Sequence, residues 1–70
     1  MKTKSNFTIF ISNIEIGKKI ECFFTKRKLI VKEKNIKENK IKLKEKTSKN
    51  SNWFSQVDFI EINNTFKFLH

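Results

Sequence analysis

Residues 40–46 read Lys40-Ile41-Lys42-Leu43-Lys44-Glu45-Lys46, with a lysine at every second position. Because successive side chains of a β-strand point to opposite faces, this alternation predicts a strand with two different faces. One face would carry Ile41, Leu43 and Glu45, and the other would carry the lysines. The segment therefore predicts a strand that is buried on one face and solvated on the other.

A helix over residues 32–46 is the main alternative to this strand. Lys, Glu and Leu are good helix formers, and oppositely charged pairs four residues apart would support a helix here. Its apolar face would consist only of Leu29, Ile36 and Leu43, which recur once per heptad. Such a face is too thin to hold a helix against a core, so we favour strands in this region.

The N-terminal third also predicts strands. Residues 7–11 are rich in β-branched and aromatic side chains, which favour a strand buried on at least one face. Ser12-Asn13 interrupts this run as a bulge or a tight turn. Ile14 and Ile16 then show the alternation of a half-buried strand.

Gly17 is the one glycine of the chain, and its tolerance of positive φ predicts a tight turn. Gly17 suits the first central position of a type II′ turn, which would join two strands as a hairpin. The second of these strands would span residues 19–25. Its more apolar face would carry Ile20, Cys22 and Phe24, so we expect the Cys22 thiol in the core.

The middle and end of the chain predict further short strands between polar turns. Residues 29–31 are consecutive apolar residues and indicate a strand covered on both faces, followed by a loop at residues 35–39. After a polar connector at residues 47–52, we expect a strand over residues 57–62.

Asn63-Asn64 then predicts a hairpin turn, because asparagine tolerates left-handed φ. Phe66 and Phe68 in the last strand would face the core together.

Five or six short strands joined by brief turns describe an all-β fold. We expect a small antiparallel barrel or a bent meander, SH3-like or OB-like in its strand number and turn spacing. With 37% hydrophobic residues the chain is too apolar for a disordered segment, and its 70 residues leave room for one small basic domain, residues 1–70.

Positive charge is the strongest functional signal. The chain holds 16 basic and seven acidic residues, for a net charge of +9. Residues 26–49 hold eleven of the basic residues and three glutamates, so nearly all the excess lies in one third of the chain. A/T-rich codons explain part of the lysine content, but they favour glutamate equally and do not explain the surplus. A clustered positive field attracts polyanions, although a lysine-rich edge that resists aggregation has the same appearance.

The candidate anion-binding residues follow from this clustering. Lys26-Arg27-Lys28 predicts a basic turn, and alternate lysines of a strand would form a row that follows a phosphate backbone. Trp53 would add a stacking platform for bases if its ring were exposed. With so little core available, we expect instead that Trp53 and Phe54 are both buried. The candidates are Lys26, Arg27, Lys28, Lys40, Lys42, Lys44, Lys46 and Trp53.

Catalytic and metal-binding chemistry is poorly supplied. Cys22 is the one cysteine, and the one histidine, His70, ends the sequence, where fraying is the default. The sequence places no carboxylate and no cysteine beside His70. Asp58 and Glu61 would face opposite sides of a strand, so they do not form an acid/base pair. We therefore expect no enzymatic activity, no metal site and no cofactor.

These features favour a non-enzymatic module that binds the backbone of RNA or DNA with little sequence preference. The alternative is a protein inhibitor or adaptor of the kind that phages and mobile elements encode, docking on an acidic or nucleic-acid-handling host protein such as a CRISPR effector. Attachment to an anionic membrane is less favoured, because no exposed apolar anchor is evident beside the basic segment. No stretch is apolar enough for a membrane span and no signal peptide is evident, so we expect a soluble, cytoplasmic protein.

Overall fold

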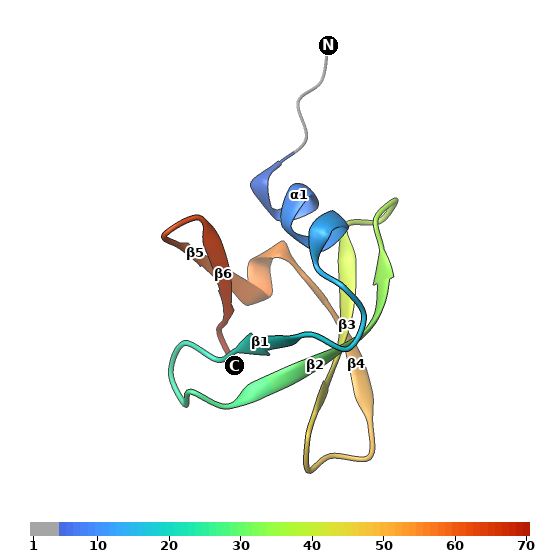
Figure 1. The fold of residues 1–70 in the computed structure, drawn as a ribbon, viewed down its shortest axis with the longest axis vertical. Coiled ribbons are helices and arrows are strands. Elements are labelled where there is room, and N and C mark those ends of the chain that lie inside the picture. The colour runs from blue at the N-terminus through green and yellow to red at the C-terminus, as the bar shows by residue number, and fades with distance from the viewer. Residues whose placement is uncertain (1–4) are drawn as a thin grey trace.

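The computed structural model describes residues 5–70, which form a bent β-meander with one short helix (Figure 1). Strands β1 to β4 form an antiparallel sheet in sequence order, and β5 and β6 form a separate hairpin. The predicted all-β meander is confirmed, and the strands do not close a barrel. In chain order the elements are α1 (Asn6–Asn13), β1 (Lys19–Glu21), β2 (Lys28–Asn35), β3 (Lys40–Glu45), β4 (Ser51–Ser55), the 3₁₀-helix η1 (Gln56–Asp58), β5 (Phe59–Ile62) and β6 (Thr65–Phe68).

The alternating segment forms β3, as the lysine pattern predicts. Ile41 and Leu43 are fully buried, while Lys42 and Lys44, at the alternate positions, face away from the core. The alternative helix over residues 32–46 does not form, because β2 and β3 pair as a hairpin across the turn at residues 36–39. Asn39 ends that turn with a φ of 59°, a conformation that asparagine tolerates better than most residues.

One irregularity interrupts the pairing of β2 with β3. Val31 lies opposite Leu43 and Glu33 lies opposite Lys42, so Lys32 is an extra residue in β2. An extra residue of this kind is a β-bulge, which bends a strand and increases its twist. The bulge therefore contributes to the curvature of the sheet.

Residues 7–11 form a helix, and the strand expected there is wrong. Ser5 caps the N-terminus of α1, since its hydroxyl oxygen accepts a hydrogen bond from the Thr8 backbone N–H at 3.1 Å. Phe7 and Ile11, four residues apart, are both fully buried and form the apolar stripe of the helix. Burial of this stripe outweighs the strand preference of the individual residues.

The half-buried strand expected at Ile14 and Ile16 is also absent from the described residues. Ile14 caps the C-terminus of α1, and Ile16 is exposed in the following turn. The Lys34 ammonium group donates hydrogen bonds to the backbone oxygens of Ile14 at 2.8 Å and Ser12 at 3.2 Å. This contact places a cation at the negative end of the helix dipole, which is stabilising.

Gly17 adopts positive φ as predicted, with a value of 94°, but its turn differs from the expected one. The Lys18 backbone N–H donates to the Glu15 backbone oxygen at 3.1 Å, so Gly17 occupies the second central position of the turn. Positive φ at that position is the requirement of a type II turn. The turn joins α1 to β1 and does not join two strands.

The C-terminal hairpin follows the sequence more closely. Asn63 and Asn64 both have positive φ, and Phe66 and Phe68 are both buried, as predicted. The preceding strand begins two residues later than expected, at Phe59, because Val57 belongs to η1 and is 83% exposed.

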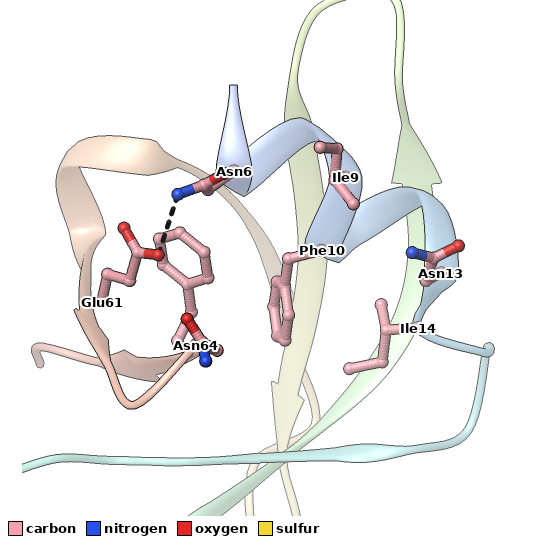
Figure 2. Close-up of a pocket in the computed structure, with 8 residues that line it drawn as sticks. Asn6, Ile9, Phe10, Asn13, Ile14, Glu61 and Asn64 are labelled. Carbon is pink, nitrogen blue, oxygen red and sulfur yellow. Dashed lines mark hydrogen bonds between the residues drawn. The ribbon is translucent and has the colours of Figure 1, made fainter. Parts of the chain in front are cut away.

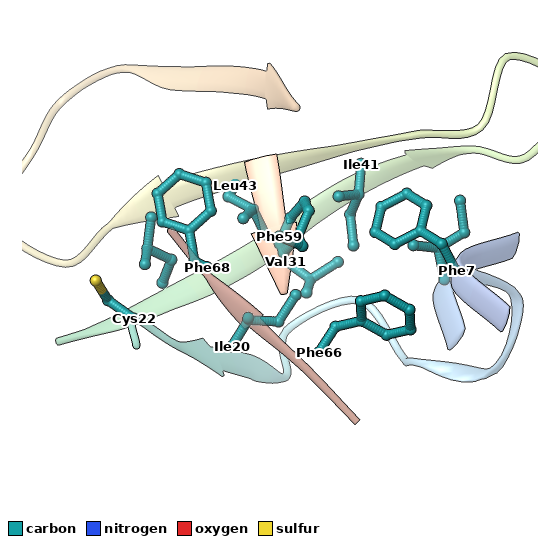
Figure 3. Close-up of a cluster of buried hydrophobic side chains, with 11 residues drawn as sticks. Phe7, Ile20, Cys22, Val31, Ile41, Leu43, Phe59, Phe66 and Phe68 are labelled. Atoms are coloured by element: carbon teal, nitrogen blue, oxygen red, sulfur yellow. The ribbon is translucent and has the colours of Figure 1, made fainter. Parts of the chain in front are cut away.

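The core lies between the β1–β4 sheet on one side and α1, β5 and β6 on the other (Figure 3). Phe7 lies at one end of this cluster and Cys22 at the other (Figure 3). An isolated parallel bridge joins Cys22, the residue after β1, to Phe68 of β6, and the Phe23 backbone N–H donates to the Phe68 oxygen at 2.8 Å. The expected burial of the Cys22 thiol is therefore confirmed.

Candidate nucleic-acid interface

The outer face of the β1–β4 sheet, defined as the face opposite Ile41 and Leu43, carries the lysine row. Pairing places Lys44 between Ile30 and Ser51 on this face, and places Lys42 between Glu33 and Trp53. Lys40 follows on the same face between Asn35 and Ser55. Three of the predicted lysines therefore project in one direction from a single central strand.

Trp53 lies on this outer face and is 43% exposed, so its expected burial is wrong. Because Trp53 pairs with Lys42 in the outward phase of β4, its ring points away from the core. The Lys42 ammonium nitrogen lies 5.6 Å from the centroid of the Trp53 ring, a cation–π geometry. Phe54 points the opposite way and is half-buried, with its ring 4.6 Å from that of Phe68.

The predicted basic turn follows the end of β1. β1 ends at Glu21, and the Lys26 backbone N–H donates to the Cys22 oxygen at 3.0 Å. Lys26 has a φ of 63°, and its ammonium group donates to the Phe23 backbone oxygen at 3.2 Å. Arg27 forms an ion pair with Glu45 at 2.8 Å, which ties the turn to the end of β3.

This turn overturns two expectations, that Phe24 shares the buried face of a strand over residues 19–25 and that no apolar anchor lies beside the basic segment. The chain turns before Phe24 can join the core, so its side chain is 67% exposed, and Phe23 beside it is also exposed. The two rings pack edge to face with centroids 5.2 Å apart. An exposed aromatic pair therefore lies directly beside the basic turn, where the sequence showed no apolar anchor.

Carboxylates offset part of the positive charge on the outer face. Glu33 lies 3.6 Å from the Lys42 ammonium group, and both groups are partly solvated. Glu21 accepts a hydrogen bond from Lys67 at 3.0 Å, and this contact lowers the pKa of the Glu21 carboxyl below its ordinary value of 4.5. Two glutamates thus accompany the lysines of this face, and the row itself stays predominantly cationic.

Two neighbouring clefts lie where β2 begins and β3 ends. The first has a volume of about 290 Å³ and an apolar floor that includes Leu29, Leu43 and Phe54. The second has a volume of about 350 Å³ and is lined by Arg27, Lys28, Glu45, Lys46 and Thr47. Arg27 and Glu45 line both clefts. Sequence reasoning identified the cations here but not the clefts, because the clefts depend on how the turn and the strand ends meet.

A third cavity of about 440 Å³ lies between α1 and the β5–β6 hairpin (Figure 2). Ile9, Phe10 and Ile14 line it from the helix side, and the Asn6 amide donates to the Glu61 carboxylate at 3.0 Å across its edge. The sequence did not predict this cavity, because a strand was expected at residues 7–11 where the helix that lines the cavity forms.

His70 has neighbours that the sequence did not place there. Its ring Nε2 lies 2.8 Å from the Asp58 carboxylate, and the Cys22 thiol donates to the His70 backbone oxygen at 3.0 Å. Among residues 5–70, no group of three His, Cys, Asp or Glu side chains is arranged to hold a metal ion. No helix within the same residues is long and apolar enough to cross a membrane.

Comparisons with known proteins return no match for this chain among protein-family models, curated proteins or solved structures.

Proposed function

We propose that this protein is a non-enzymatic nucleic-acid-binding module whose outer sheet face contacts phosphates with little sequence preference. The observation that carries the proposal is the alignment of Lys40, Lys42 and Lys44 on one face of β3, beside the exposed ring of Trp53. Alternate residues of a strand project about 6.6 Å apart, so the three lysine side chains leave the strand as a regular row. Such a row follows a flexible phosphate backbone without reading bases.

The type of cation supports low sequence specificity. The chain contains Arg27 as its one arginine, and its other cationic side chains are lysines. Lysine attracts phosphate as a point charge, whereas the arginine fork is the group that reads guanine edges and phosphate oxygen pairs. Arg27 is already engaged by Glu45. Backbone attraction is therefore the main source of affinity in this proposal.

Trp53 favours single-stranded over duplex nucleic acid. An unpaired base can stack on an exposed aromatic ring for about 1–3 kcal/mol, whereas bases in a duplex are already stacked on one another. Since Trp53 lies next to Lys42 across the strands, a base on the ring and a phosphate on the lysine fit one continuous strand. We place this binding in the cytoplasm, whose reducing conditions suit the free thiol of Cys22.

Titration of a labelled single-stranded oligonucleotide at rising salt tests the proposal. We expect log affinity to fall with log salt with a slope of about −2 if three phosphates are contacted, at about 0.7 per contact. The variant Lys42→Glu/Lys44→Glu should bind at least about tenfold more weakly. Lys18→Glu/Lys37→Glu is the matched control, because it changes the net charge equally at two exposed turn residues.

Three results would refute the proposal. They are absence of binding at low salt, binding that does not respond to salt, and equal loss of affinity in the row variant and its control. Binding to anionic vesicles in place of oligonucleotides would assign the lysines to a membrane, with Phe24 as the exposed anchor.

A second candidate function is docking on a nucleic-acid-handling protein, as a phage-type inhibitor would do. β4 is the terminal strand of the sheet, so its outer edge is available to pair with a strand of a partner. A stoichiometric protein partner that stays bound after nuclease treatment would favour this candidate over direct nucleic-acid binding.

A further inference from the structure

The core has a covered end and an open end. At the covered end, Phe7 of α1 packs on Phe59 and Phe66, with ring centroids 5.1 and 5.3 Å apart. At the open end, near Cys22, no helix lies over the inner face of the sheet among the described residues (Figures 1 and 3). The apolar cleft of about 290 Å³ lies here, with Leu29 and Leu43 on its floor.

The rim of this apolar cleft is polar. Ser48, Asn50 and Asn52, from β4 and the preceding turn, line one side of it. The side-chain amides of Asn50 and Asn52 form no hydrogen bond within residues 5–70. The contacts of Asn50 with the Ser48 hydroxyl involve only the main chain of Asn50. Two amides and the Glu45 carboxylate therefore offer donors and acceptors above a floor that includes the Phe54 ring. The cleft therefore suits a flat molecule whose apolar face packs on the floor and whose polar edge forms hydrogen bonds with the rim.

The neighbouring cleft is suited to an anion. Arg27, Lys28 and Lys46 line it, against one carboxylate, Glu45. Lys28 pairs with Glu21, and its side chain points to the outer face of the sheet. The basic cleft therefore adjoins the face that carries the lysine row. A strand leaving that row thus meets Lys28 and Lys46, beside the Arg27–Glu45 ion pair, at the end of the sheet before it reaches the apolar cleft.

We infer that the paired clefts form a site for one unpaired nucleotide, with its base in the apolar cleft and its phosphate in the basic cleft. The apolar cleft lies near the lower end of the usual range for ligand pockets, about 300 Å³, which suits one base. Amide and carboxylate groups recognise the hydrogen-bonding edge of a base, and cations recognise the phosphate. The inference rests on the proposed nucleic-acid binding and names where one base is held.

Nucleoside monophosphates are suitable probes because they carry one base and one phosphate. In backbone-amide and methyl NMR spectra, we expect the four common ribonucleoside monophosphates to shift the signals of Leu29, Leu43, Asn50 and Asn52. Ribose 5-phosphate, which lacks the base, should shift only signals near Lys28 and Lys46. Equal patterns from the two kinds of probe, or nucleotide shifts confined to Trp53, would overturn the inference.

Two pocket variants and a control sharpen the test. Asn50→Ala/Asn52→Ala removes the rim amides and should weaken nucleotide binding about tenfold, since each lost hydrogen bond contributes modestly. Asn52→Phe fills the cleft from an exposed strand position and should abolish the Leu43 shift. Asn13→Ala removes an exposed amide at the opposite end of the molecule and should change nothing. An unchanged nucleotide affinity in both pocket variants would refute the site.

Failure of this site is distinguishable from failure of the proposed function. If the row binds but the clefts do not, the pocket variants will hold a salt-sensitive oligonucleotide as tightly as the wild type, and nucleotides will not shift the pocket signals. If the proposed function is wrong, the wild type will not bind the oligonucleotide, or will bind it without dependence on salt or on the lysine row.

Discussion

The inner and outer faces of the β1–β4 sheet differ in composition although they share every strand. On the inner face Val31, Ile41 and Leu43 are buried to 1% exposure or less. On the outer face the intervening positions of β3 carry Lys42 and Lys44, and Trp53 stands beside them. Neighbouring residues of β3 point to opposite faces of the sheet. We therefore expect substitutions at its inward positions to change stability and substitutions at its outward positions to change binding.

The largest expected effect is on the inner face. Ile41→Ala should lower the free energy of unfolding by about 2–5 kcal/mol, because it removes a fully buried side chain and leaves a cavity. Lys44→Ala on the outer face should change it by no more than about 0.5 kcal/mol. Urea unfolding followed by circular dichroism measures both. A similar loss in the two variants would show that the faces are not energetically distinct.

On the outer face, Trp53→Ala should weaken single-stranded oligonucleotide binding by about 1–3 kcal/mol, because the stacking surface is lost. Val57→Ala is the control, since Val57 is 83% exposed in η1, outside the sheet. Fluorescence anisotropy measures the affinity, and the wild-type indole fluorescence should change on binding. Unaltered affinity in Trp53→Ala would show that the outer face binds nucleic acid through its charges alone, without stacking on Trp53.

Lys34 is a lysine of β2 that serves the inner side of the sheet. Lys34→Met keeps an apolar stem but removes the hydrogen bonds to Ser12 and Ile14, so the unfolding free energy should fall by about 1 kcal/mol. Lys37→Met in the exposed turn is the control. Thermal unfolding measures the difference, and oligonucleotide affinity should stay the same. A binding defect equal to that of the row variant would place Lys34 in the interface.

The smallest effect concerns acid stability at Glu21. The contact with Lys67 lowers the pKa of Glu21 in the folded protein below 4.5, so its stabilising contribution is complete above that pH. The contribution is lost as the pH falls from 4.5 through the lower folded pKa. Glu21→Gln should therefore lose less stability than the wild type over this interval in urea unfolding. Parallel losses would show that the Glu21–Lys67 pair adds nothing to folding.

The predictability of the fold follows the clarity of the periodic pattern. The strict alternation of residues 40–46 and the Asn63-Asn64 turn predicted their elements correctly, because each segment has one arrangement that buries its apolar residues. Residues 7–11 have high strand propensity, and a strand would place Phe7, Ile9 and Ile11 on one face; the helix instead buries Phe7 and Ile11 and leaves Ile9 45% exposed. The serine at position 5, a residue favoured as a helix N-cap, was the available signal for the helix.

For the candidate interface, sequence predicted the cations better than their surroundings. Lys40, Lys42 and Lys44 share one face as the alternation predicts. The exposure of Trp53 and Phe24 was missed, because each depends on tertiary structure. Trp53 is exposed because the register of β4 with β3 places it opposite Lys42, and Phe24 is exposed because β1 ends at Glu21. The clefts at the strand ends arise from three segments distant in sequence, and no local pattern encodes such a meeting.

The extra residue at Lys32 has an effect beyond curvature. In strict alternation from Val31 through Lys32, Glu33 would point inward and Lys34 outward. Because the bulge shifts the alternation by one residue, Glu33 lies opposite Lys42 on the outer face and Lys34 lies opposite Ile41 on the inner face. The bulged conformation at Lys32 thereby sets the sides taken by two opposite charges. If Lys32 took part in regular alternation, the Glu33 carboxylate would face the electron-rich last turn of α1, and the helix would meet repulsion where the Lys34 ammonium group now anchors it.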